Sequence, residues 1–333
     1  MGILTAACAA SLPGVTPQAA AEGNPKPGPA TRAYVANGAA DTVSVIDVNT
    51  NTLLATVAVG DTPIDVELDP GRARAYVTNR ESDSVTVINT DTNAVVTTIT
   101  VGNAPWEVAV DPGRARAYVA NAVDGSVSVI NTETNAVETV VPVGAGPIGV
   151  AVDPGRARAY VTNGDDDNVS VINTETNAVL TTVPVGDRPF SVAVDPDRGR
   201  AYVVNEFSNS VSVIDTDANA VVGTVTVGAV PTGVAVDPGR DRAYVVNSDD
   251  DNVSVINTET NAVVTNVTVG DEPARVAVDP AGARAYVTNG ADDTASVINT
   301  DTNEVVDTLT TGDGPVGVAI LNVPGKGKPK PKP

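Results

Sequence analysis

Short apolar runs separated by polar turns recur through most of the chain. One stretch, residues 147–186, contains four runs in which apolar and polar residues alternate: Ile148–Val152, Ala159–Thr162, Val169–Asn173 and Ala178–Val185. Alternation with a period of two, in runs rich in Val, Ile, Thr and Tyr, is typical of β-strands and not of helices. The pattern therefore predicts a unit of four short antiparallel strands, which we call a to d in chain order.

The turns between these runs carry residues with specific backbone preferences. Asp153-Pro154-Gly155 places Pro where φ is restricted and Gly where φ turns positive, which predicts a type II turn. The turn Asn173–Asn177 ends in Asn, the non-glycine residue that best tolerates the left-handed conformation of a bulged hairpin.

The unit is repeated seven times with a period of 42 residues. Its marker is Ala-Tyr-Val followed two residues later by Asn, and it contains every tyrosine of the chain: Tyr34, Tyr76, Tyr118, Tyr160, Tyr202, Tyr244 and Tyr286. Four strands in a unit of this length describe a β-propeller blade, and seven blades can close into a ring. An open stack of the same units is the alternative.

The two ends of the repeat region favour the ring. No strand a precedes Tyr34, whereas Val316–Leu321 supplies a spare one after the last complete copy. Leu321 stands where six copies have Asp-Pro, as expected for a strand that makes no further turn. We expect this strand to pair with the N-terminal blade, which leaves few free edges. The fold class predicted is all-β, a seven-bladed propeller over residues 31–323.

The repeats resemble the YVTN β-propeller family, whose name-giving motif occurs verbatim three times, at residues 76–79, 160–163 and 286–289. The other copies read Tyr-Val-Ala-Asn or Tyr-Val-Val-Asn, and the resemblance covers about residues 31–323. It implies a secreted or cell-surface protein, in some members a surface-layer-like one. It implies no catalytic residues for this chain.

The termini differ from the repeats. Residues 1–30 are rich in Ala and Pro, with a short apolar stretch and a small-residue pattern at Ala19–Ala21 that reads as a weak or truncated export signal. Leu4–Cys8 loosely resembles a lipoprotein attachment site. Residues 324–333 form a basic, Pro-rich tail, predicted to be an extended arm or a contact for an anionic wall polymer. We expect an extracellular or cell-envelope location.

Charge narrows the partners. The formal net charge is −21, no histidine is present, and all five lysines lie in the two terminal segments. An acidic ring repels phosphate backbones and anionic lipid, so we expect no nucleic-acid partner. Solubility in salt is the alternative reason for the charge. No apolar run is long enough to span a membrane as a helix, and we expect a monomer.

Antiparallel alternation sorts the turns onto two faces of the ring. The d–a and b–c turns share one face, which we call the variable face because its turns differ among the copies. The a–b and c–d turns share the other, which we call the uniform face because Asp-Pro-Gly-Arg and Asn-Thr-Glu-Thr-Asn recur there. The variable face is the more acidic, so we expect it to attract cations or basic partners.

Aromatic residues other than tyrosine are confined to the variable face. Trp106 and Phe190 follow the prolines of two d–a turns, Phe207 lies in a b–c turn, and Arg188 is close by in the sequence. Exposed aromatics on a polar face are common binding anchors. The alternative is that they plug the mouth of the channel or cover a loop.

A second group breaks the repeat in strand a. Asp65 and Glu67 lie two residues apart, so both side chains point to one side of the strand, and residue 67 is Ala in the other copies. Glu107 holds the position of Asp65 in the following blade, and Arg275 holds it in what we take to be the preceding blade. A carboxylate cluster beside an arginine at the axis suits a metal, a polar ligand or acid–base work. The alternative is a charge satisfied by an arginine or by channel water.

The densest acidic clusters lie in two b–c turns. Oxygen ligands suit Ca²⁺, although the spacing matches no calcium-loop motif and solvated turns are the alternative. The weak calcium candidates are Asp165, Asp167, Asp249 and Asp251. No other cofactor is expected.

The composition excludes several chemistries. Without histidine, a Ser-His-Asp triad, His-ligated zinc and His-ligated haem cannot form from this chain, and without lysine in the ring no internal Schiff base can form. We therefore predict a non-enzymatic binding or scaffold propeller whose ligand is a protein, a glycan or a small molecule. Its site is expected on the variable face, at Asp65, Glu67, Trp106, Glu107, Arg188, Phe190, Phe207 and Arg275. One alternative is a lyase or hydrolase that uses Asp65, Glu67 and Glu107. Another is a purely structural surface protein.

Overall fold

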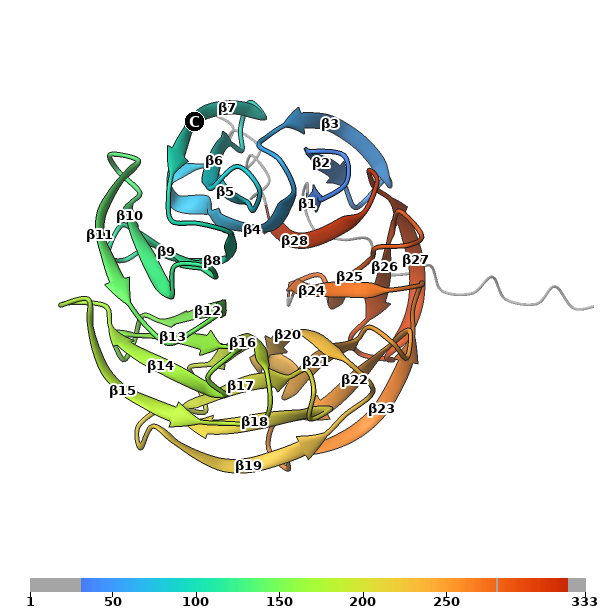
Figure 1. Cartoon of the computed structure of the whole chain (residues 1–333). Coiled ribbons are helices and arrows are strands. Elements are labelled where there is room, and N and C mark those ends of the chain that lie inside the picture. Colours follow the sequence, from blue (N-terminus) through green and yellow to red (C-terminus); the bar gives the residue numbers. More distant parts are fainter. Residues whose placement is uncertain (1–30, 280, 323–333) are drawn as a thin grey trace, which may run out of the picture.

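The computed structural model describes residues 31–279 and 281–322, which form a closed ring of seven four-stranded antiparallel sheets around a central axis (Figure 1). The predicted seven-bladed propeller is confirmed. Blade 1 is built from both ends of this region, in the order β28-β1-β2-β3, and blades 2 to 7 each take four consecutive strands from β4 to β27. The predicted leader and basic tail lie outside the described residues.

The strands form four concentric layers (Figure 1). The innermost, a, are β28 (Pro315–Asn322), β4 (Pro63–Asp69), β8 (Pro105–Asp111), β12 (Pro147–Asp153), β16 (Pro189–Asp195), β20 (Pro231–Asp237) and β24 (Pro273–Asp279). The next, b, are β1 (Thr31–Asn37), β5 (Arg74–Asn79), β9 (Arg116–Asn121), β13 (Arg158–Asn163), β17 (Arg200–Asn205), β21 (Arg242–Asn247) and β25 (Arg284–Asn289).

The outer two layers follow the same order around the ring. Strands c are β2 (Thr42–Asp47), β6 (Ser84–Asn89), β10 (Ser126–Asn131), β14 (Asn168–Asn173), β18 (Ser210–Asp215), β22 (Asn252–Asn257) and β26 (Thr294–Asn299). Strands d are β3 (Thr52–Ala58), β7 (Ala94–Thr100), β11 (Ala136–Pro142), β15 (Ala178–Pro184), β19 (Ala220–Thr226), β23 (Ala262–Thr268) and β27 (Glu304–Thr310). Within the described residues the only helical turns are of the 3₁₀ type, Pro70–Arg72 and Pro238–Arg240.

The ring closes as predicted, because β28 pairs antiparallel with β1, with Leu321 opposite Arg32 and Val318 opposite Val35. This pairing joins the last strand of the ring to the first, so strand b of blade 1 has a neighbour on both edges.

The hydrophobic core lies between neighbouring blades. Tyr34 of blade 1 is fully buried and packs in a cluster that contains Val66 and Ile88 of blade 2, and its hydroxyl donates to the Thr90 carbonyl oxygen at 3.2 Å. The Asn that ends each repeat marker connects turns. Asn79 donates to the Thr86 hydroxyl at 2.9 Å and accepts from the Gly60 N–H at 3.1 Å. The marker residues are therefore scaffold, which explains why all seven blades carry them.

The turn predictions are half right. Asn177 has φ of 58°, as expected for the left-handed residue of the c–d turn. The type II prediction for the a–b turn is wrong, because Ala157 has φ of 52° and Gly155 is not among the residues of positive φ. In blade 2 the Pro-Gly-Arg segment instead forms a 3₁₀ turn, Pro70–Arg72. The residue that follows, Ala73, adopts the left-handed conformation. The prediction failed because it placed the left-handed residue at the Gly, whereas the turn is longer and places it two residues later.

The turns lie on the two faces that strand alternation predicts. On the uniform face, arginines of the a–b turns reach across to c–d turns of the next blade: Arg72 pairs with Glu133 at 3.3 Å while also holding the buried Asp69 at 3.0 Å. On the variable face, the b–c and d–a turns meet, as where the Arg80 N–H donates to the Thr62 carbonyl oxygen. In the part of the chain that the structure describes, no helix is long and apolar enough to cross a membrane.

Candidate functional site in the axial channel

Strands a line the axis, and the third residues of the seven strands form one ring around it. Three blades have glycine there because the neighbouring strand leaves no room: a Cβ on Gly149 would lie 2.5 Å from the Phe190 carbonyl oxygen, and one on Gly317 would lie 2.7 Å from the Asp65 Cα. Around this ring the seven residues are Asp65, Glu107, Gly149, Ser191, Gly233, Arg275 and Gly317. Every charged group of the ring is thus an exception to a small-residue pattern.

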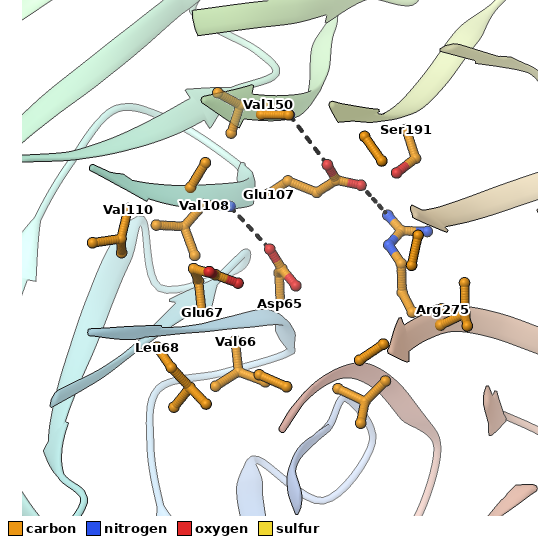
Figure 2. A pocket seen from close by; sticks show the side chains of 18 of the residues that line it. Asp65, Val66, Glu67, Leu68, Glu107, Val108, Val110, Val150, Ser191 and Arg275 are labelled. Carbon is orange, nitrogen blue, oxygen red and sulfur yellow. Dashed lines mark hydrogen bonds and ion pairs between the residues drawn. The ribbon is translucent and has the colours of Figure 1, made fainter. Parts of the chain in front are cut away.

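Glu107 and Arg275 form a buried ion pair across the channel, with Arg275 Nη2 and Glu107 Oε1 3.1 Å apart (Figure 2). The pair is held from both sides: the Val150 N–H donates to Glu107 Oε2 at 3.1 Å, and Arg275 Nη1 donates to the Thr232 carbonyl oxygen at 2.7 Å. Burial raises the pKa of Glu107 to about 7, although the charge of Arg275 opposes the rise. A carboxylate therefore lies beside an arginine at the axis, although the sequence did not single out this particular pair.

One placement in the prediction is wrong. Arg275 is not in the blade that precedes Asp65, because β28 of blade 1 lies between β24 and β4 and brings Gly317 against Asp65 (Figure 1). Strand a of blade 1 comes from the end of the sequence. Counting blades from the N-terminus therefore places Arg275 directly before Asp65 and omits β28 between them. Arg275 therefore reaches across the axis to Glu107 instead of contacting Asp65 as a direct neighbour.

Asp65 and Glu67 project from β4 into the channel beside this pair (Figure 2). Asp65 Oδ2 accepts a hydrogen bond from the Val108 N–H at 3.0 Å, yet burial still raises its pKa. Burial, reinforced by the charge of Asp65, raises the pKa of Glu67 to about 8. At neutral pH the Glu67 carboxyl is therefore mostly protonated, and it can donate a hydrogen bond as well as accept one.

These side chains line an axial cavity of about 560 Å³. Its lining runs along strands a from the third residue to the sixth and ends with Pro70 of an a–b turn. In blades 4 to 7 exposure rises in the same direction: the third residue, such as Arg275, is buried, whereas the fifth and sixth, such as Ala151 and Val152, are half-buried. Blades 2 and 3 do not share this trend, because Leu68, Ala109 and Val110 are buried. The cavity is therefore reached from the uniform face.

Aromatic side chains cover the opposite end. The Trp106 and Phe190 rings meet edge to face with centroids 5.7 Å apart, Arg80 lies 4.8 Å over Trp106, and Arg275 lies 5.0 Å over Phe190. Phe190 is buried, so the expectation of an exposed anchor is wrong for it, and Trp106 is half-buried. The alternative is confirmed for this pair: the rings close the channel at the variable face, a geometry favoured by their quadrupoles and by the cations.

The remaining two predicted site residues lie apart from the cavity. Arg188 contacts the Phe207 ring at 5.2 Å and pairs with Glu206 at 2.5 Å, and neither Arg188 nor Phe207 lines the channel. Phe207 is 65% exposed, as expected for an aromatic in a b–c turn. The eight predicted residues therefore divide into a cavity set, a closing pair and an outlying pair.

The acidic turns have a structural role. Asp167 accepts a hydrogen bond from the Arg188 N–H at 2.8 Å, and Asp251 accepts one from the Glu272 N–H at 3.0 Å, while Asp165 and Asp249 are exposed. Among residues 31–279 and 281–322, no group of three or more acidic side chains is arranged to hold a metal ion. Calcium binding at these turns stays a prediction.

Ser191 is the cavity residue that the sequence reasoning missed. It occupies the same third position as Glu107 and lines the cavity opposite Asp65. The signal was present in the sequence, because aligning the seven copies at this position isolates one serine among three glycines and three charged residues.

The fold and this site together define a seven-bladed β-propeller with an axial cavity that is polar on one side. A family model described as "Lactonase, 7-bladed beta-propeller" matches residues 92–317, and one described as "YNCE-like beta-propeller" matches residues 1–123. The first match spans more than half of the chain, and the chain belongs to that family. The narrower resemblance to YVTN-repeat and surface-layer-like proteins stays a prediction. A search of curated proteins found no match.

Solved structures share the fold at low identity. A functionally unknown protein from Desulfotomaculum acetoxidans superposes with a TM-score of 0.78 at 17% identity, covering 87% of this chain and 98% of that one. Hydrazine synthase from Kuenenia stuttgartiensis gives 0.70 at 20% identity, covering 78% and 95%. AztD from Citrobacter koseri gives 0.62 at 15% identity, covering 88% and 98%. At these identities the likeness concerns the fold alone.

Proposed function

We propose that the protein is a non-enzymatic binding module whose ligand, a small molecule, occupies the axial cavity. One observation carries this proposal: the charged residues that break the repeat in strand a, namely Asp65, Glu67, Glu107 and Arg275, all line the same cavity. Apart from Ser191, the rest of its wall is apolar, mainly valine and alanine. Polar groups concentrated in an otherwise apolar pocket are the usual composition of a ligand site.

The ligand enters from the uniform face in this proposal. The Trp106–Phe190 pair and the Glu107–Arg275 ion pair stand between the cavity and the variable face, while in blades 4 to 7 the lining residues become more exposed toward the a–b turns. This differs from the predicted site on the variable face, where Arg188 and Phe207 would have contributed. The half-buried Trp106 remains a reporter, because its partner Phe190 stacks under Arg275, which lines the cavity.

A fragment screen on the full chain tests the binding role. Alanine methyl NMR signals would be followed while anionic, neutral and cationic fragments are added. We expect saturable shifts at Ala109 and Ala151 on the cavity wall, with loss of affinity in Glu67→Ala. The matched control is Glu81→Gln, an exposed acid of a b–c turn. A screen in which no fragment class moves the cavity methyls would refute the proposal.

Hydrolysis of a cyclic ester is the second candidate, and the state of Glu67 favours it. The family is described as lactonase. A protonated Glu67, whose pKa burial raises to about 8, could donate a proton to the ring oxygen as the acyl C–O bond breaks. Asp65 would accept a proton from the attacking water, so that lactone and water give a hydroxy acid; this step requires the ionised form of Asp65, which burial disfavours by raising its pKa.

Turnover distinguishes the two candidates. The hydrolase candidate predicts that the full chain consumes base in a pH-stat assay with a panel of lactones, and that Glu67→Ala abolishes this without unfolding the ring. Binding of a lactone that returns unhydrolysed would leave only the binding role. Glu81→Gln again serves as the control.

We propose an extracellular or cell-envelope location for this binding role, on the support of the weak export pattern in residues 1–30. Fractionation of cells that express the full chain tests the location, and recovery in the cytoplasm would contradict it. A purely structural surface protein is the competing role: it requires ordered self-association, so a monomer at high concentration with divalent cations present would count against it.

A further inference from the structure

The charges that line the cavity are unbalanced. Glu107 and Arg275 neutralise one another and are both more than nine-tenths buried. Asp65 and Glu67 remain, are half-buried, and face the cavity from one strand (Figure 2). No ion pair joins either of them to a cation within the described part of the chain. The cavity therefore holds two neighbouring carboxyl groups without a cation of their own, and a cationic ligand would favour their ionised forms.

A second, independent feature is an unused donor on the opposite side. Arg275 lines the cavity, its side chain is 9% exposed, and its Nε has no hydrogen-bond partner among the described residues. An unsatisfied buried donor costs free energy, which a ligand oxygen would recover after a small rotation of the side chain. The cavity thus offers acceptors for a cation on one wall and a donor for an oxygen on the other.

The remaining wall sets the size and character of the ligand body. Ala109, Ala151 and Ala193 occupy the level of Glu67 in the next three blades, and further alanines complete the ring. Such a wall contacts a short hydrocarbon chain favourably but forms no hydrogen bonds through its side chains. An organic cation suits this composition, because an ammonium group has three donors and can satisfy two carboxylates at once.

We propose that the axial cavity binds small primary amines that also carry an oxygen acceptor, with the ammonium group on Asp65 and Glu67 and the oxygen toward Arg275. The inference rests on the proposed binding role and specifies its ligand class. The hydrocarbon between the two ends lies against the alanine wall.

The amine should release a proton from the protein when it binds. Burial and the neighbouring Asp65 charge raise the pKa of Glu67 to about 8, and a cation nearby favours the ionised carboxylate. Affinity is therefore expected to rise by up to roughly fifty-fold between pH 6 and pH 8, as the ionised fraction of Glu67 in the free protein grows, while the amine itself stays protonated. Calorimetry in two buffers of different ionisation enthalpy would measure the released proton.

Three probes of similar size separate the contributions: aminobutanol, butylamine and butanediol, each titrated into the full chain with calorimetry and alanine methyl NMR. We expect aminobutanol to bind about tenfold or more tightly than butanediol, and a few-fold more tightly than butylamine. Glu67→Ala and Asp65→Gly place at these sites residues that other blades already carry, so both should fold and should lose the preference for amines. Glu81→Gln should keep it.

The outcomes separate the ligand class from the binding role. If butanediol or an anionic fragment shifts the cavity methyls and the amines do not, the amine inference is wrong and the binding role stands. If the amine preference survives both Glu67→Ala and Asp65→Gly, the carboxylates do not recognise the amine and the inference is overturned. Equal affinities for butylamine and aminobutanol would show that Arg275 does not bind the ligand oxygen. Binding by no probe class would overturn the binding role as well.

Discussion

Carboxylates of the b–c turns on the variable face and carboxylates of the axial cavity differ in how they occur in the repeat and in what they contact. In the turns, Asp83, Asp167 and Asp251 occupy equivalent positions, and each accepts a backbone N–H of a d–a turn. In the cavity, Glu67 stands where the six other copies have Ala. Asp65 stands at a position where Glu107 is the only carboxylate among the other copies. A carboxylate that recurs with the repeat is scaffold, and one that interrupts the repeat is a candidate for function.

The environments explain the difference. The turn aspartates lie at the surface, where water solvates the oxygen that does not accept the N–H, so acidity there costs little. The cavity carboxyls lie among alanine and valine, where burial raises the pKa of Asp65, Glu67 and Glu107 alike. Keeping three such groups together opposes stability, which is the usual cost of a binding or reacting site.

The largest predicted effect comes from breaking the buried pair. Glu107→Ser leaves Arg275 buried without its counter-charge, and we expect a loss of about 3–5 kcal/mol in the free energy of unfolding. Arg275→Ser should cost a similar amount. Ser191 shows that serine fits this ring position, so the double variant should lie within about 1 kcal/mol of the wild type.

Urea denaturation of the four proteins checks this cycle. The contrary result would be additive losses in the double variant, which would mean that the pair contributes no coupling and that each side chain acts through separate packing.

The second prediction asks whether the glycine positions can accept a side chain at all. Gly149→Ala puts a Cβ 2.5 Å from the Phe190 carbonyl oxygen, so the neighbouring strands must separate. We expect a loss of about 2–3 kcal/mol, measured by thermal and urea unfolding. Gly223→Ala in β19, where a Cβ would meet nothing closer than 4.0 Å, is the matched control and should be close to neutral. Equal losses would show that crowding at the axis is not the cause.

How far the sequence could predict this molecule follows from what repeats. The tyrosine period predicts the blades, and Leu321 in place of Asp-Pro predicts the strand that closes the ring. Glu67 was recognisable because the other copies have Ala there. The closed end of the channel could not be recognised from the sequence, because Trp106, Phe190 and Arg275 come from blades 3, 5 and 7 and meet only across the axis. Repeat alignment compares equivalent positions but contains no information about contacts across the ring.

The third prediction concerns the pH dependence of stability. Because the pKa of Glu67 is about 8 in the folded chain against an ordinary 4.5, the folded state binds more protons between these pH values. The contribution of Glu67 is therefore fully present below pH 4.5 and is lost as pH rises through 8. Glu67→Ala should remove this loss and should raise the free energy of unfolding at pH 8 by about 2 kcal/mol.

Urea midpoints of wild type and Glu67→Ala at pH 5, 7 and 9 would measure the effect. Parallel curves for the two proteins would contradict a raised pKa at Glu67. Glu81→Gln, which removes an exposed acid, should follow the wild type at each pH.

The smallest predicted effect returns to the turn carboxylates. Asp167→Ala removes the acceptor for the Arg188 N–H and should cost about 1 kcal/mol. Asp167→Asn keeps an oxygen acceptor and should be within about 0.5 kcal/mol of the wild type, because Asn209 already accepts the Val230 N–H at the equivalent position of blade 5. If the asparagine variant were as damaging as alanine, the negative charge itself would matter, and the calcium prediction for these turns would gain support. If Asp167→Asn has wild-type stability, the turn needs only an oxygen acceptor. The proposed recognition of amines in the cavity, by contrast, needs charged carboxylates.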